Sequence, residues 1–112
     1  MAKTANRAFS RQNLEALELL AQMIRVGRIE RKMSAQEVAN RAGISRPLLR
    51  RIENADPSCG IGSVFEVAAI AGVPLFGSEP DRIQIQRSVL TEKLSLLPQR
   101  ARKPRRIIRD DF

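Results

Sequence analysis

The 112-residue sequence contains no histidine, tyrosine or tryptophan, and cysteine occurs once, at Cys59. Without histidine the chain lacks the commonest general base and the commonest metal ligand. A single cysteine excludes an internal disulfide and a cysteine-based zinc site. The chain also lacks a glycine-rich phosphate loop, and its acidic residues are scattered. These absences predict a protein that is not an enzyme and that holds no metal and no cofactor.

Long apolar runs are missing as well. No segment approaches the roughly 18 apolar residues of a membrane span, so we expect no membrane partner. The first ten residues, MAKTANRAFS, lack the apolar core of a signal peptide. The sequence therefore predicts a cytoplasmic location.

Basic residues are what the chain has in excess. Lysine and arginine outnumber aspartate and glutamate by 20 to 12, which gives a formal net charge of +8. This balance favours a polyanionic partner such as nucleic acid, although an ordinary basic surface would carry the same charge. The length fits one domain with a short appendage. Since the apolar residues are mostly Ala, Leu, Ile and Val, an all-α fold of small packed helices is expected.

Two short helices with clear capping signals are predicted in the middle of the chain. Ser34 and Glu37 have the spacing of a capping box, so a helix should begin directly after Ser34. Gly43 permits the positive φ of a tight turn, and Ser45 caps a second helix over residues 46–54. Two helices joined in this way have the helix-turn-helix layout, in which the second helix reads the major groove of DNA.

The outward face of that second helix is basic. Leu49 and Ile52 are three residues apart on its inner face, so Arg46, Pro47 and Arg50 point outward. Proline is tolerated there because it falls in the first turn, where its missing N–H costs little. Arginine at such positions is the usual bidentate partner of guanine, and a solvated helix face is the alternative.

Three further residues are candidates for contact with the DNA backbone. Arg51 either reaches a phosphate or pairs with Glu53 or another neighbour. Ser45 is a cap in any case, and a cap at this place can also donate to phosphate. Ser34 stands at a helix N-terminus, whose N–H groups and positive dipole attract anions.

Helical patterns also flank the central pair. One runs from Ser10 to about residue 32, interrupted by Gly27, which either lets another helix approach closely or only lowers stability. Another covers residues 61–72 and is followed by the short turn VPLFG at 73–77. In residues 82–97 the apolar positions fit an amphipathic helix that contacts a second copy or a partner, or else packs back on its own domain; these positions are 83, 85, 89, 90, 94 and 97.

These patterns divide the chain into four segments. Residues 1–12 are a flexible N-terminal arm, residues 13–77 the helix-turn-helix DNA-binding domain, and residues 78–97 the C-terminal helix. Residues 98–112 are a tail with six Arg or Lys against two Asp, two prolines and no packing pattern, which predicts disorder in isolation.

Residues 20–76 resemble the lambda-repressor-like helix-turn-helix domain of the Cro/C1 or xenobiotic-response-element family. MSAQEVANRAGIS, LLRRIEN and VPLF carry the resemblance. It implies a five-helix domain, here with an extra C-terminal helix and a basic tail, and an inward ion pair between Arg28 and Glu53. The family usually has a glutamine at the second position of the first short helix. This sequence has Ala35 there and Gln36 one step on, so Gln36 is the candidate for that DNA contact.

A narrower resemblance is to HipB-type antitoxins. It rests on IRVGRIERKMS, on DPSCGIGSVFEVAAIAGVPLF and on the ending LSLLPQRARKPRRIIRDDF. It implies a homodimer that binds an inverted-repeat operator in double-stranded DNA, represses its own operon and neutralises a HipA-like Ser/Thr kinase toxin. The alternatives are a stand-alone repressor whose C-terminal segment only dimerises, and a non-specific basic nucleoid-type protein.

Overall fold

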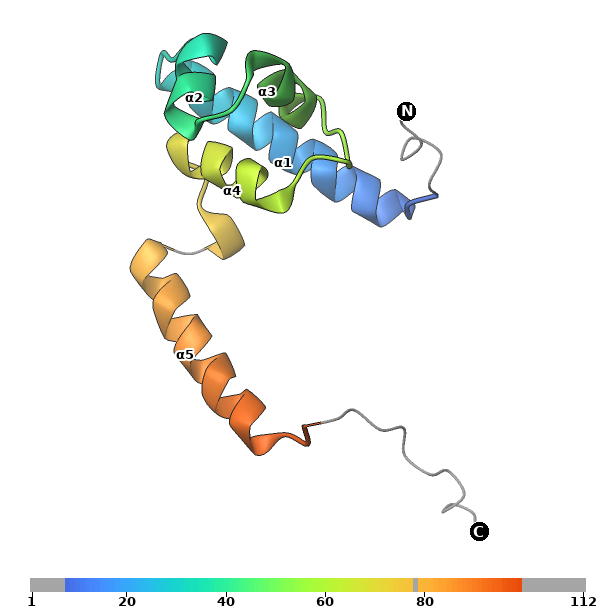
Figure 1. Ribbon diagram of the computed structural model, residues 1–112, viewed down its shortest axis with the longest axis vertical. Coiled ribbons are helices and arrows are strands. Elements are labelled where there is room, and N and C mark those ends of the chain that lie inside the picture. Colours follow the sequence, from blue (N-terminus) through green and yellow to red (C-terminus); the bar gives the residue numbers. More distant parts are fainter. Residues whose placement is uncertain (1–7, 78, 100–112) are drawn as a thin grey trace. The chain divides into compact units, whose positions relative to one another are not determined.

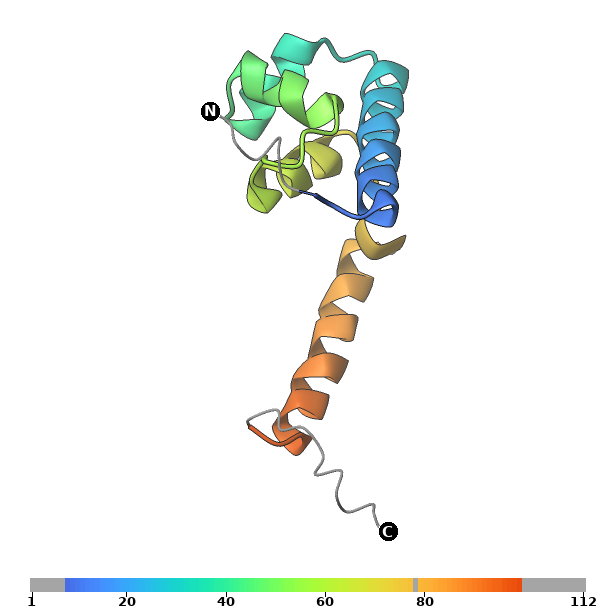
Figure 2. The ribbon, with the colours of Figure 1, turned by 90° about the vertical axis from the view of Figure 1, so that its right-hand side faces the viewer.

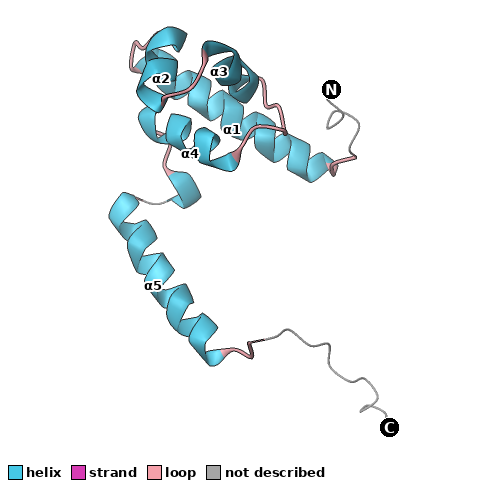
Figure 3. Cartoon of the chain, in the orientation of Figure 1, coloured by secondary structure: helices cyan, strands magenta, loops and turns pink. Residues whose placement is uncertain are grey.

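The computed structural model describes residues 8–77 and 79–99, and in this part of the chain every regular element is a helix (Figure 3). The predicted all-α fold class is therefore confirmed. The chain divides into two units, residues 1–79 and 80–112, which are described separately. The elements, in chain order (Figure 1), are α1 (Arg11–Glu30), α2 (Ala35–Ala42), α3 (Arg46–Glu53), α4 (Ile61–Ile70), the 3-10 turn η2 (Leu75–Gly77) and α5 (Pro80–Leu96).

Helix bounds differ from the expected ones by a few residues. α1 begins at Arg11, directly after Ser10, where the helical pattern of the sequence starts, and the segment boundary after residue 12 stays a prediction. Residues 1–7 of the arm lie outside the described residues, as does the tail from residue 100 onward.

Serine hydroxyls begin three of the helices. Each serine has extended backbone angles, and its side-chain oxygen accepts from the backbone N–H three residues later. The bonds are Asn13 N–H to Ser10 (3.1 Å), Glu37 N–H to Ser34 (3.0 Å) and Leu48 N–H to Ser45 (3.1 Å). A serine cap is worth about 1 kcal/mol. The Glu37 carboxylate does not complete the capping box; it accepts instead from Arg41 Nη2 at 3.0 Å.

The ends of α1 to α4 share one backbone motif. Each helix is followed by a residue with left-handed φ, and the next N–H donates to the carbonyl five positions back. Such ends normally place an apolar residue directly after the left-handed one. The four pairs are Lys32 and Met33, Gly43 and Ile44, Ala55 and Asp56, and Gly72 and Val73. Three of the second members are apolar and pack into or against the core; after α3 the position holds an aspartate.

A small core holds the first unit together. Its four largest fully buried side chains, Ile24, Val38, Leu49 and Val67, come from α1, α2, α3 and α4 in turn. Burying such a side chain contributes about 1.5–3 kcal/mol. α2 packs against α3 and α4, while α1 contacts the same two helices along one side of the unit (Figure 2). The small residues Ala39, Ala68 and Ala71 are fully buried and allow this close packing.

Gly27 lies where the end of α4 crosses α1. A Cβ at this position would overlap the carbonyl oxygen of Ala71, the residue that follows α4. The same oxygen accepts from Arg31 Nη1 at 3.1 Å, one turn further along α1. Of the two explanations that the sequence left open for this glycine, the structure therefore selects close approach.

The apolar residues of α5 form two rows and not the single stripe that the sequence predicted. Ile83, Leu90 and Leu94 are spaced by seven and four residues, which places them on one face of α5, and Leu97, directly after the last residue of the helix, continues the same spacing. Ile85, Val89 and Leu96 fall on a second face. Arg82, Gln86 and Lys93 separate the two rows. The single-stripe prediction is wrong because positions 85 and 89 lie about 100° or more around the helix from positions 83, 90 and 94.

We expect Gly27→Ala to lower the free energy of unfolding by about 1–3 kcal/mol, because relieving the overlap must move α4 away from α1. This loss exceeds the gain of about 1 kcal/mol in helix propensity. Urea unfolding followed by circular dichroism measures the difference. Gly62→Ala in α4 is the matched control, since its Cβ would meet open space, and it should leave stability unchanged or higher. Equal stability of the two variants would contradict the close approach.

Candidate nucleic-acid interface

A tight turn fixes the geometry of α2 and α3. Gly43 adopts φ 70°, and Ile44 packs against the core with its N–H donating to Ala39 O at 3.0 Å. Ser45 then caps α3, whose inner residues Leu49 and Ile52 are buried. The opposite side of α3 is consequently turned to solvent, as the helix-turn-helix pattern predicted.

Arg28 and Glu53, the pair that the family resemblance implies, join α1 to the end of α3. Arg28 Nε and Nη2 donate to Glu53 Oε2 and Oε1 at 2.7 and 3.1 Å, and Arg28 Nη1 donates to Met33 O at 3.2 Å. Both side chains are largely buried, with 15% and 10% exposure. The hydrogen bonds to Glu53 raise the pKa of Arg28 against the opposing effect of burial. A bidentate pair of this kind fixes both distance and rotation between the two helices.

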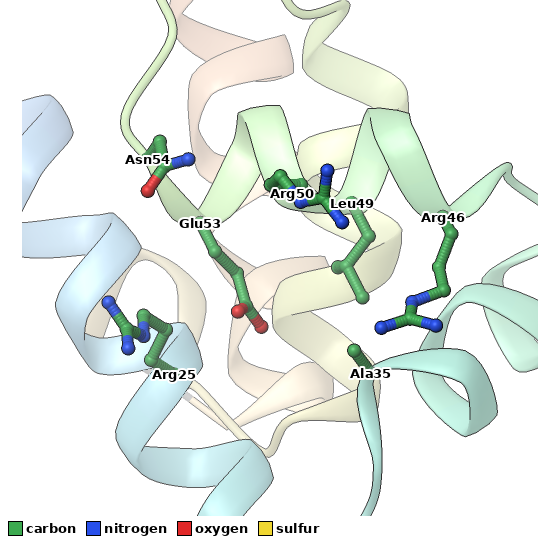
Figure 4. A pocket seen from close by; sticks show the side chains of 7 residues that line it. All are labelled: Arg25, Ala35, Arg46, Leu49, Arg50, Glu53 and Asn54. Atoms are coloured by element: carbon green, nitrogen blue, oxygen red, sulfur yellow. The ribbon is translucent and has the colours of Figure 1, made fainter.

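Beside this ion pair lies a pocket of about 180 Å³ (Figure 4). It is lined by Arg25 from α1, Ala35 at the start of α2, and Arg46, Leu49, Arg50, Glu53 and Asn54 from α3 and the residue after it. Among the described residues, the guanidinium groups of Arg25, Arg46 and Arg50 have no hydrogen-bond or ion-pair partner. Three arginines from α1 and α3 therefore line one pocket with the first turn of α2 and keep their guanidinium groups free of any partner among the described residues.

Arg25 is the residue that sequence reasoning missed. It lies one turn before Arg28 on α1, and Arg28 was expected to face α3 through its pair with Glu53. Residues three apart on a helix share a face, so Arg25 had to lie near α3 as well. The signal was present, but only in combination with the ion pair.

The other polar candidates are exposed, and their contacts are local. Gln36 Nε2 donates to Asn40 Oδ1 at 2.9 Å along α2. Ser34 and Ser45 use their oxygens as caps, which leaves each hydroxyl hydrogen available to a further acceptor. Pro47 occupies the first turn of α3 on the exposed side.

Arg51 pairs with a neighbour, which is Asp56 and not Glu53, and its contact with DNA stays a prediction. Arg51 Nε donates to Asp56 Oδ2 at 3.0 Å, and Arg51 Nη2 donates to Ser58 Oγ at 2.8 Å. Ser58 in turn donates to Asp56 Oδ1 from Oγ at 2.7 Å and from its backbone N–H at 2.8 Å. The three side chains form a closed ring of hydrogen bonds next to the outward face of α3.

Comparison with protein families gives one match. Residues 24–76 fit the family model described as Helix-turn-helix, a stretch just under half of the chain that begins within α1 and ends within η2. This part of the chain is therefore a helix-turn-helix domain, and the match supports a DNA-binding transcription regulator of the lambda-repressor-like class. Neither the curated proteins nor the solved structures gave a match. The narrower resemblance to HipB-type antitoxins thus stays a prediction.

No helix in the described ranges is both long and apolar enough to cross a membrane. Within the same residues, no three His, Cys, Asp or Glu side chains gather into a group that could hold a metal ion.

The ring of hydrogen bonds formed by Arg51, Asp56 and Ser58 predicts how the stability of the fold depends on pH. The pKa of Asp56 is lowered to about 2, first by the Ser58 hydroxyl, then by the Ser58 N–H and by Arg51. A lowered folded-state pKa stabilises the fold above the unfolded value of 3.8, and this contribution disappears as the pH falls towards 2. Wild type should therefore be more stable than Asp56→Asn at pH 5, and in urea unfolding the difference should narrow as the pH falls below 3.8 and vanish only below about 2. A gap that stays constant with pH would contradict the ring.

Proposed function

We propose that this protein is a sequence-specific repressor that inserts α3 into the major groove of DNA. The observation that carries the proposal is a set of three arginines without a partner among the described residues: Arg46 and Arg50 on the outward side of α3, and Arg25 on the neighbouring helix α1. In this layout the N-terminal part of the second helix approaches the base edges. Repression follows where the operator overlaps a promoter.

The residues divide between base reading and backbone contact. Arg46 and Arg50, on α3, are the readers, because a guanidinium matches the O6 and N7 acceptors of guanine. Arg25 comes from α1, behind the groove-facing helix, and suits a phosphate. Ser34, Ser45 and Gln36 complete the phosphate contacts, together with the free N–H groups at the start of α2. The ring of Pro47 lies on the exposed face of α3, where it can contact a thymine methyl group.

We further propose a homodimer formed through α5. Ile83, Leu90, Leu94 and Leu97, with Arg87 between the first two, follow the alternating four- and three-residue spacing of a heptad seam. A second copy supplies the matching seam, and one polar side chain at such a position selects register and partner number. The two α3 helices would then contact half-sites about 34–36 Å apart on an inverted repeat.

Selection from random DNA duplexes tests the proposal, and the full chain should enrich an inverted repeat with half-sites one helical turn apart. On that operator Arg50→Ala should cost about 1–3 kcal/mol and relax the preference at one base pair. Arg25→Ala should weaken all sequences alike and reduce the slope of log affinity against log salt by about 1. Arg11→Ala, at the far end of α1, removes the same charge as a control and should change neither. Failure to enrich any sequence would contradict the proposal.

As a second candidate we propose the antitoxin role, with a HipA-like Ser/Thr kinase toxin as the protein partner. The support is the sequence resemblance together with the second apolar row of α5, Ile85, Val89 and Leu96, which the heptad seam does not use.

Co-expression with the product of the adjacent gene tests the antitoxin role. A kinase-like protein should co-purify with the full chain, and Val89→Asp should abolish co-purification while leaving operator binding intact. Loss of both properties together, or a clean purification without any kinase-like protein, would leave the stand-alone repressor as the function.

A further inference from the structure

The end of α3 breaks a pattern that the other helices keep. α1, α2 and α4 each follow their left-handed residue with an apolar side chain that packs on the core, namely Met33, Ile44 and Val73. After α3 the equivalent residue is Asp56. Its N–H makes the same bond to the carbonyl five positions back, Arg51 O, at 3.0 Å, so the backbone motif is intact. Only the side-chain contact has changed, from apolar packing to an ion pair.

That exchange costs a core contact and does not neutralise a buried charge. Arg51 and Asp56 have side-chain exposures of 50% and 32%, so neither needs the other for solvation. Exposed ion pairs contribute little to stability. Departures from a local rule of this kind concentrate at functional surfaces.

The ring also uses one particular edge of the guanidinium. Nε and Nη2 face Asp56 and Ser58, while no described residue accepts from Nη1. The edge formed by Nη1 and the second hydrogen of Nη2 therefore remains for an outside acceptor. Two parallel N–H groups on that edge match guanine O6 and N7.

Arg51 also flanks the groove-facing side of α3 opposite the free arginines. With 3.6 residues per turn, Pro47 and Asn54 lie along the middle of the exposed face, Arg46 and Arg50 on one side of them, and Arg51 on the other. Arg51 alone of these three arginines is held by other side chains. An arginine that is already ordered loses less side-chain entropy when it binds.

We propose that Asp56 and Ser58 are positioning residues that hold Arg51 as a third base reader, so that preference for guanine at one operator position depends on a loop beyond the recognition helix. This rests on the proposed function, since it requires α3 to face the bases. The hydrogen bonds from Ser58 and Arg51 lower the pKa of Asp56 to about 2, so its carboxylate is ionised at neutral pH.

Binding of the full chain to the selected operator and to variants with each base pair exchanged tests the inference. Arg51→Ala should reduce discrimination at one base pair by about tenfold. Asp56→Ala, Asp56→Asn and Ser58→Ala should reduce discrimination at that same base pair by about two- to fivefold. In an Arg51→Ala background they should add nothing, because they act through Arg51. Thermal unfolding at the binding pH identifies any variant that is not folded, and the isosteric Asp56→Asn and the milder Ser58→Ala then stand in for Asp56→Ala.

Glu37→Ala is the matched control, because it frees Arg41 from a carboxylate on α2 that is at least as exposed as Asp56. It should leave the Arg51 position unchanged. If Asp56→Ala instead tightens binding to all sequences equally, Asp56 only neutralises Arg51 and the inference is wrong; unchanged discrimination also overturns it. A wild-type chain with no preferred sequence would overturn the proposed function as well, whereas a preferred sequence with a uniform Asp56 effect overturns this inference alone.

Discussion

The ion pair between Arg28 and Glu53 is the interaction on which the candidate interface depends. It links α1 to the last turn of α3, and through Met33 O it also holds the chain just before α2 begins. Among the ion pairs of the described residues it is the one in which both side chains are mostly buried. Removal of either side chain would leave the other charge buried without a partner. This would lower the free energy of unfolding far more than the loss of an exposed ion pair. Three helices thus share one electrostatic anchor, and the outward direction of α3 follows from it.

Around this anchor the arginines divide into two groups. The first group donates hydrogen bonds to carboxylates, a hydroxyl or a carbonyl of the same chain; it consists of Arg28, Arg31, Arg41 and Arg51. The second group, Arg25, Arg46 and Arg50, donates no hydrogen bond to any described residue. The net charge of the sequence could not make this distinction, since every arginine counts alike in it. The positions of the carboxylates decide which arginines stay unpaired, and the unpaired ones produce a local excess of positive charge beside α2 and α3.

Much of the fold could be predicted from short-range signals. The serine caps Ser34 and Ser45 and the glycine turn depend on residues whose spacing is visible in the sequence, whereas the Arg28–Glu53 pair was implied by the family resemblance. What escaped prediction depends on contacts distant in the chain. The role of Gly27 depends on Ala71, and the part that Arg25 plays depends on α3. The partner of Arg51 lies only five residues away, but the left-handed conformation of Ala55 that turns the chain back is unusual for alanine and gave no signal.

The two apolar rows of α5 bear on stoichiometry. In the proposed homodimer, a two-fold axis between the paired α5 helices would cover the same row on each copy, so the uncovered row would occur twice, on symmetry-related sides. Any protein that docks on that row would therefore bind in two equivalent copies per dimer, and the assembly would contain equal numbers of both chains. One such dimer would bind one operator duplex and two partner molecules. A complete complex would therefore contain one duplex for every two partner molecules.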